Sequence, residues 1–151
     1  MLWSLTPLAH DLFPDRHDAL TLDLIASIRN ALGEDSLTRV IQARTQRQLE
    51  SLRKSIDPQA PLRARLEALA TQRTAEGYMA EVAESSDGGL LLVEHHCPIC
   101  DAAKECQMFC STELALFQDA LGPDVVVRRE NHLLSGDDRC VYGVRPRAST
   151  D

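Results

Sequence analysis

The sequence predicts an α+β protein in which a helical segment precedes a small antiparallel sheet. Two observations favour this class. Before Gly77, apolar residues recur at intervals of three and four, the period of an amphipathic helix. After Gly77, short alternating or apolar runs are separated by turns that contain glycine, a pattern typical of strands and hairpins. We therefore expect N-terminal dimerisation helices, then a β-hairpin, a helix and two further antiparallel strands.

The first two helices have narrow apolar stripes. The first begins at Asp15 and ends at Gly33, because glycine commonly follows the last turn of a helix. The second begins at Asp35 or Ser36. The stripes consist of Leu20, Leu24, Ile25, Ile28 and Leu32 in the first helix, and of Leu37, Val40, Ile41, Leu49, Leu52 and Ile56 in the second.

The third helix is expected to begin with Asp57 as its N-cap and Pro58 as its first helical residue, and to stop before Gly77. None of these helices has a sheet partner nearby in the sequence. Narrow stripes suit packing against other helices, including those of a second subunit. The sequence thus favours a homodimer formed through residues 15–76, and a self-contained helical hairpin is the alternative.

Shorter elements follow Gly77. Asp87-Gly88-Gly89 is a tight-turn signal between two expected strands, and this hairpin delivers the chain to Cys97. A helix with Ser111 as its N-cap is expected to run to the Gly-Pro pair at 122–123. The expected strands cover 78–84, 90–95, 125–127 and 140–144. Residues 77–146 form the expected cysteine-rich α+β sensory domain, and 147–151 a frayed tail.

Composition and charge limit the classes of function. The chain has 151 residues and a net charge of −7, which disfavours nucleic-acid binding through bulk electrostatics. The basic run from Arg39 to Lys54 is typical of a solvated helix face. There is no signal peptide and no apolar run near the ~20 residues of a membrane span. These features predict a cytoplasmic protein without membrane contact, in which cysteines stay reduced.

The cysteines are the most unevenly distributed residues. Four of the five, Cys97, Cys100, Cys106 and Cys110, lie within 14 residues, and Cys140 follows 30 residues later. If the last strand pairs with the hairpin strand that precedes Cys97, Cys140 joins the others. Soft thiolates so close together select zinc or an iron–sulfur cluster. The spacing matches neither two clean C-x₂-C zinc pairs nor the ferredoxin run.

Three other readings of these thiols remain open. They are unligated core residues, since cysteine is often buried, or they stabilise a dimeric interaction domain through zinc. In the third, Cys97 and Cys100 form a redox dithiol, although a hairpin replaces the usual thioredoxin-like context. A catalytic thiol is not favoured, because no nucleophile elbow or protease signature is present, and we expect no enzyme. His95 and His96 are more typical of hydrogen-bonding strand-edge residues than of ligands.

Several motifs resemble those of a known family. They are Glu94-His-His-Cys97-Pro-Ile, Cys110-Ser-Thr-Glu-Leu-Ala-Leu-Phe117, Gly122-Pro-Asp-Val-Val-Val127 and His132-Leu-Leu-Ser-Gly-Asp-Asp-Arg-Cys140-Val-Tyr142. Together they resemble the sensory half of SufR-like transcriptional regulators, which are winged-helix (ArsR/DeoR-type) repressors that sense iron–sulfur clusters. The opening residues 1–14 are similar to the end of the wing and the linker in that family.

The resemblance implies a cofactor, its ligands and a partner. Cys97 and Cys110, with twelve residues between them, and Cys140 in the last strand match the family's cluster ligands. The family's further cysteine, near Asp124 here, is absent, so Cys106 or Cys100 is the expected fourth ligand. The implied cofactor is a [4Fe–4S] or [2Fe–2S] cluster, with zinc as the alternative. DNA would be bound only through a winged-helix head, and this chain has no room for one before Trp3.

Overall fold

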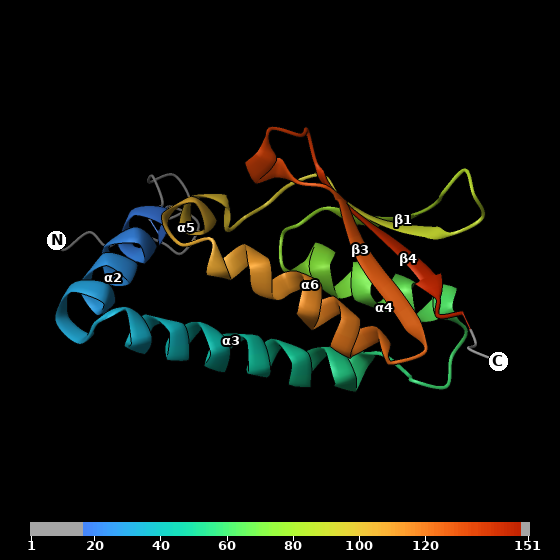
Figure 1. The fold of residues 1–151 in the computed structure, drawn as a ribbon, viewed down its shortest axis with the longest axis horizontal. Helices are drawn as coiled ribbons and strands as arrows, with labels where there is room; N and C mark the ends of the chain where they lie inside the picture. Colours follow the sequence, from blue (N-terminus) through green and yellow to red (C-terminus); the bar gives the residue numbers. More distant parts are fainter. Residues whose placement is uncertain (1–16, 149–151) are drawn as a thin grey trace, which may run out of the picture.

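The structure is a computed structural model that describes residues 17–148 (Figure 1). The α+β class is confirmed: over these residues, helices come first and a four-stranded antiparallel sheet follows. In chain order the elements are α2 (His17–Leu32), α3 (Glu34–Ser55), α4 (Leu62–Ala75), β1 (Ala80–Glu84), β2 (Leu90–Glu94), α5 (Cys100–Glu105), α6 (Met108–Leu121), β3 (Val125–Asn131), the 3₁₀ turn η1 (Leu133–Ser135) and β4 (Cys140–Pro146).

The sheet has the strand order β1-β2-β4-β3. The last strand pairs with the second hairpin strand, which is the condition stated above for Cys140 to join the other cysteines, and the register sets Glu94 of β2 opposite Cys140 of β4. Helices α4 and α6 pack against the strands, and α3 lies along α6 (Figure 1). The β3–β4 connection extends from the sheet toward the end of the molecule where α2 and α5 lie.

The main core lies between the sheet and the helices α3, α4 and α6. In β4, Cys140, Tyr142 and Val144 alternate toward this core, as the two-residue period of a strand requires. The rings of Phe117 and Tyr142 meet edge to face, with centroids 4.9 Å apart. Other buried members are Leu49, Leu52, Ile56, Leu66, Leu69, Ala70, Leu92, Leu116, Ala120, Leu121, Val125 and Val127.

A second, smaller apolar cluster joins α2, α3 and α5. Its buried members are Ile25, Leu37, Ile41, Ala102 and Cys106. At its edge the guanidinium of Arg29 donates to a carboxylate oxygen of Glu105 over 2.7 Å. This cluster fixes α5, the helix that follows Cys97, against the first two described helices.

The predicted start of α4 is wrong. The helix begins at Leu62, five residues after Asp57, and Pro61 occupies the N-cap position. A carboxylate oxygen of Asp57 instead accepts a hydrogen bond from the backbone N–H of Gln59 at 2.9 Å, which makes a local turn. The second proline decides the boundary, because the residue before a proline is pushed out of helical geometry.

The predicted start of α6 is also wrong. The helix begins at Met108, so Ser111 lies inside its first turn rather than at its N-cap. The hydroxyl of Ser111 donates to the carbonyl of Met108 over 3.4 Å. The chain already turns at Cys106, whose carbonyl accepts the N–H of Phe109. Residues 1–14, taken above as a wing and linker remnant, lie outside the described residues, as do 149–151 of the expected tail.

The two N-terminal stripes have different surroundings. Most of the apolar stripe of α3 packs against other parts of the chain. Its buried members are Leu37, Ile41, Leu49 and Leu52. In α2 only Ile25 is buried. The large apolar side chains left exposed are Leu20, Leu24, Leu32, Val40 and Met79. Packing within the chain therefore buries much of the apolar stripe of α3 but little of that of α2.

Among residues 17–148, no helix combines the length and the apolar character that crossing a membrane requires.

Substituting Gly122, the residue that follows the last turn of α6, tests the backbone geometry of the connection between α6 and β3. Its φ of 109° and ψ of 170° suit glycine almost alone. A Cβ added there would lie 2.9 Å from Asp124 Oδ1 and 3.3 Å from Arg65 Nη1. We expect Gly122→Ala to lower the free energy of unfolding by about 1–3 kcal/mol in urea titrations.

A matched control separates the backbone from the contact. Gly33 has nearly the same conformation (φ 85°, ψ 164°), but an added Cβ meets nothing within 4 Å. Gly33→Ala should therefore cost only the backbone strain, and Gly122→Ala should cost more. Equal losses in the two variants would show that crowding of the added Cβ against Asp124 and Arg65 costs nothing beyond the backbone strain.

Candidate functional site

Three cysteines from separate segments gather at one end of the sheet. Cys97 follows β2, Cys110 lies in the first turn of α6, and Cys140 is the first residue of β4. Because Cys140 pairs with Glu94, the chain leaving β2 carries Cys97 past the start of β4. Cys110 and Cys140 are buried, Cys97 is half-buried, and all three are free thiols. The structure thus brings the segments that bear the three expected ligands to one end of the sheet.

Burial keeps these thiols protonated. It raises the pKa of Cys97 from its ordinary 9.0 to about 12, and the neighbouring charges of Glu113, Cys100 and Cys140 act in the same direction. Burial also raises the pKa of Cys110 to about 11, against the opposing effect of Arg129. The pKa of Cys140 is raised as well, again mainly by burial. Such thiols are weak nucleophiles at neutral pH.

A histidine lies beside one of the thiols. The Sγ of Cys110 is 2.9 Å from Nε2 of His132, within hydrogen-bond distance, and the thiol is the donor when the ring proton is on Nδ1. The next backbone N–H, of Leu133, points at the Sγ of Cys140 over 3.5 Å. The segment that begins at His132 therefore bridges Cys110 and Cys140. Sequence reasoning did not select His132 as a ligand, although it opens the motif that ends at Cys140.

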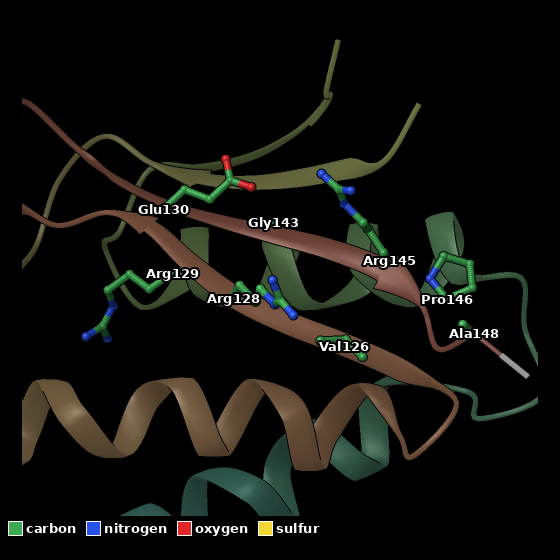
Figure 2. Close-up of a pocket in the computed structure, with 8 residues that line it drawn as sticks. All are labelled: Val126, Arg128, Arg129, Glu130, Gly143, Arg145, Pro146 and Ala148. Carbon is green, nitrogen blue, oxygen red and sulfur yellow. The ribbon is translucent and has the colours of Figure 1, made fainter. Parts of the chain in front are cut away.

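Arg129 supplies a positive charge at the same place. One of its terminal nitrogens donates to the carbonyl of Cys110 over 2.8 Å and to the hydroxyl of Tyr142 over 3.2 Å. Its buried Nε has no hydrogen-bond partner among the described residues. Figure 2 shows the Arg129 side chain leaving β3 on the helix side of the sheet, opposite to Glu130. A buried donor without a partner suits a site that receives an anionic group.

A buried ion cluster lies next to the thiols. Arg73 of α4 donates to Glu94 over 2.6 Å and to Glu113 over 2.8 Å, and Tyr78 donates to Glu113 over 3.2 Å. All three charged side chains are at most 4% exposed. Burial is the main cause that raises the pKa of Glu94, against the opposing charge of Arg73. Sequence reasoning missed this cluster, because no local pattern marks Arg73 as buried.

The two remaining cysteines have different surroundings. Cys106 is buried in the α2–α3–α5 cluster, separate from the main core that contains Cys140. Cys100 begins α5 and is half-buried. It lies within electrostatic reach of Cys97. His95 bonds through Nε2 to Glu81 at 2.8 Å, as expected of a strand-edge residue.

A small hollow opens beside Cys110. Its volume is about 290 Å³, and it is lined by Gln107, Cys110, Ser111, Arg129, His132, Leu134 and Ser135. Within residues 17–148, no three His, Cys, Asp or Glu side chains already stand where they could hold a metal ion together. The donor set itself, soft sulfur with one imidazole and a neighbouring cation, fits the chemistry of zinc or an iron–sulfur centre.

A larger hollow, of about 540 Å³, lies elsewhere along β3 and β4 and shares Arg129 with the hollow beside Cys110 (Figure 2). No cysteine or histidine lines it. Its wall is formed by Val126, Arg128, Arg129, Glu130, Gly143, Arg145, Pro146 and Ala148. Size alone therefore does not mark the site in this protein.

Comparison with models of known protein families finds no match to this chain, and a search of curated proteins also finds none. The SufR-like resemblance accordingly stays a prediction.

Proposed function

We propose that this chain is the cluster-sensing part of a cytoplasmic transcriptional regulator, with an iron–sulfur cluster held by Cys97, Cys110 and Cys140. One observation carries the proposal: the β2–β4 pairing sets Cys140 beside the segments that bear Cys97 and Cys110. When bound, the cluster would supply a redox- and oxygen-sensitive centre. The chain would hold it in place and partly exclude water.

The electrostatics support binding rather than thiol catalysis. A redox dithiol at Cys97 and Cys100 needs a depressed thiol pKa, whereas burial raises the pKa of Cys97 to about 12. A metal removes the thiol protons on binding, and Arg129 would then offset part of the resulting negative charge. The raised pKa values thus count against a redox or nucleophilic role of these thiols, whereas a metal ligand does not need to be a thiolate before the metal binds.

A route from the site to the helices supports a sensing role. Helix α5 starts at Cys100, three residues after Cys97, and packs on α2 through the smaller cluster. On α2, Leu20, Leu24 and Leu32 are each more than half exposed. We propose that this face pairs with a second copy of the chain. Occupancy of the site would then set the geometry of the pair, and through it the spacing of two DNA-reading domains.

The test is iron and sulfide analysis of anaerobically purified protein with its visible spectrum. We expect a coloured protein with stoichiometric iron and sulfide. Cys97→Ser, Cys110→Ser and Cys140→Ser should each reduce bound iron about tenfold or more. Cys106→Ser serves as the matched control, because that thiol packs in the other cluster, and should keep its iron. A colourless, iron-free wild type with intact cysteines would refute the proposal.

The same experiment examines the zinc alternative. The nearness of Cys110 Sγ and His132 Nε2 favours it specifically, since zinc commonly takes mixed sulfur and imidazole ligands. Stoichiometric zinc, no visible absorption and unfolding on chelation would identify a zinc-stabilised interaction domain instead.

A further inference from the structure

We propose that Nε2 of His132 is the fourth ligand of the metal centre and shares one metal atom with Cys110. The inference rests on the proposed function, because it concerns the same site. It replaces Cys106 and Cys100, the fourth ligands expected from the sequence. The centre would then have three cysteines and one histidine around it, with two protein ligands on one metal atom. That arrangement fits a [2Fe–2S] cluster rather than a [4Fe–4S] cluster, whose irons take one protein ligand each.

The spacing of the two donor atoms supports a shared metal. They are 2.9 Å apart, within hydrogen-bond distance. Metal–sulfur and metal–nitrogen bonds of about 2.3 and 2.0–2.1 Å at a tetrahedral angle require a separation of about 3.5 Å. Replacing the proton by a metal therefore needs the pair to widen by about 0.6 Å, which a small rotation of either side chain provides. Separate metal atoms would require a larger displacement.

The remaining contacts of His132 orient its ring. Nδ1 lies 3.4 Å from the hydroxyl of Ser135, and the backbone N–H of His132 donates to Asp137 over 2.7 Å. A proton on Nδ1 leaves the lone pair on Nε2, where it faces Cys110. Ligating histidines in proteins are typically oriented in this way through their second ring nitrogen.

The alternatives are less well placed. Cys106 belongs to the α2–α3–α5 cluster, so using it as a ligand would remove a buried side chain from that cluster. Cys100 begins α5 and lies within electrostatic reach of Cys97. His132, by contrast, precedes by one residue the N–H that already points at the Cys140 sulfur. The turn after β3 thus contacts two of the proposed ligands, Cys110 and Cys140.

Nitrogen ligation can be measured directly. The full chain is reconstituted anaerobically with ferrous iron and sulfide, reduced, and examined by pulsed electron paramagnetic resonance for a strong ¹⁴N coupling. We expect the coupling in the wild type and its loss in His132→Cys, which keeps its iron. His132→Ala should lower retained iron on the order of tenfold or more. The control His95→Ala removes an imidazole bonded to Glu81 and should leave coupling and iron unchanged.

A second readout uses the oxidised protein. Exchanging imidazole for thiolate should shift the visible absorption and circular dichroism of His132→Cys, with no shift in His95→Ala. A wild type that binds the cluster without strong nitrogen coupling overturns the assignment, as does a coupling that survives in His132→Cys. The assignment is also overturned if Cys100→Ser loses its iron while the His132 variants keep the iron content and nitrogen coupling of the wild type. In these cases the proposed function stands, whereas an iron-free wild type overturns both.

Discussion

Arg73→Met is expected to lower the free energy of unfolding by about 3–5 kcal/mol. The guanidinium is the shared partner of Glu94 and Glu113, and all three side chains are buried. Removing it leaves two carboxylates close together in the core without a cation. It also removes the stacking of the guanidinium on the Tyr78 ring, whose centroid is 3.3 Å away. Urea unfolding followed by circular dichroism measures the loss.

Helix α4 offers a matched control. Arg63 pairs with Glu84 on the surface, and its side chain is 46% exposed. Arg63→Met should change stability by less than about 1 kcal/mol, because exposed ion pairs contribute little. Adding Glu94→Gln and Glu113→Gln to Arg73→Met should recover part of the loss, since the unpaired charges are then gone. Similar effects of Arg73→Met and Arg63→Met would show that the buried cluster does not stabilise the fold.

The second large effect is a steep pH dependence of metal affinity. Cobalt(II) binding to the apo protein should strengthen by up to roughly a thousandfold per pH unit near neutral pH, because three thiols must each release a proton. The window follows from the pKa values. The pKa of His132 lies below its ordinary 6.5, mainly because the ring is desolvated. Those of Cys110 and Cys97 are raised to about 11 and 12.

The sign follows from these directions. Above the lowered histidine pKa the imidazole is neutral, and below the raised thiol pKa values every bound cysteine displaces a proton. The cobalt affinity therefore rises steeply with pH from about 7 to 9. With ordinary thiols the rise would flatten within this range, because they begin to ionise there. Thiolate-to-cobalt absorption in the presence of a competing chelator gives the affinity at each pH. Cys106→Ser should leave the slope of log affinity against pH unchanged. Cys97→Ser should lower that slope by one, because one proton fewer is released on binding. A pH-independent affinity would contradict thiol ligation.

Much of the site's framework could be predicted from short patterns. The turn at 87–89 and the apolar run before Cys97 define the hairpin, whereas the pairing of β4 with β2 joins segments far apart in the chain and could be stated only as a condition. The prediction of the hairpin depends on neighbouring residues. Local geometry of this kind is encoded within a few residues, so the sequence is sufficient.

The contacts that distinguish the site depend on distant residues. Arg73 is 21 positions from Glu94 and 40 from Glu113, and its helix reads as an ordinary amphipathic segment. His132 meets Cys110 across 22 positions, after a strand irregularity near Asn131. Neither contact has a local signature, because each forms only when the sheet and α6 are in place. The predicted start of α4 is wrong for a simpler reason: Pro58 and Pro61 each suggest a helix start, and the helix begins after the second.

The unequal size of the two apolar clusters has a consequence for local unfolding. The cluster at α2 and α5 has five buried members, among them Cys106, whereas the core beneath the sheet has many more. Protein segments open with free energies that follow the buried contacts holding them. Among residues 17–148, we therefore expect the α2–α5 end to open at a lower free energy than the sheet. Cys106 would then become exposed to solvent before Cys140.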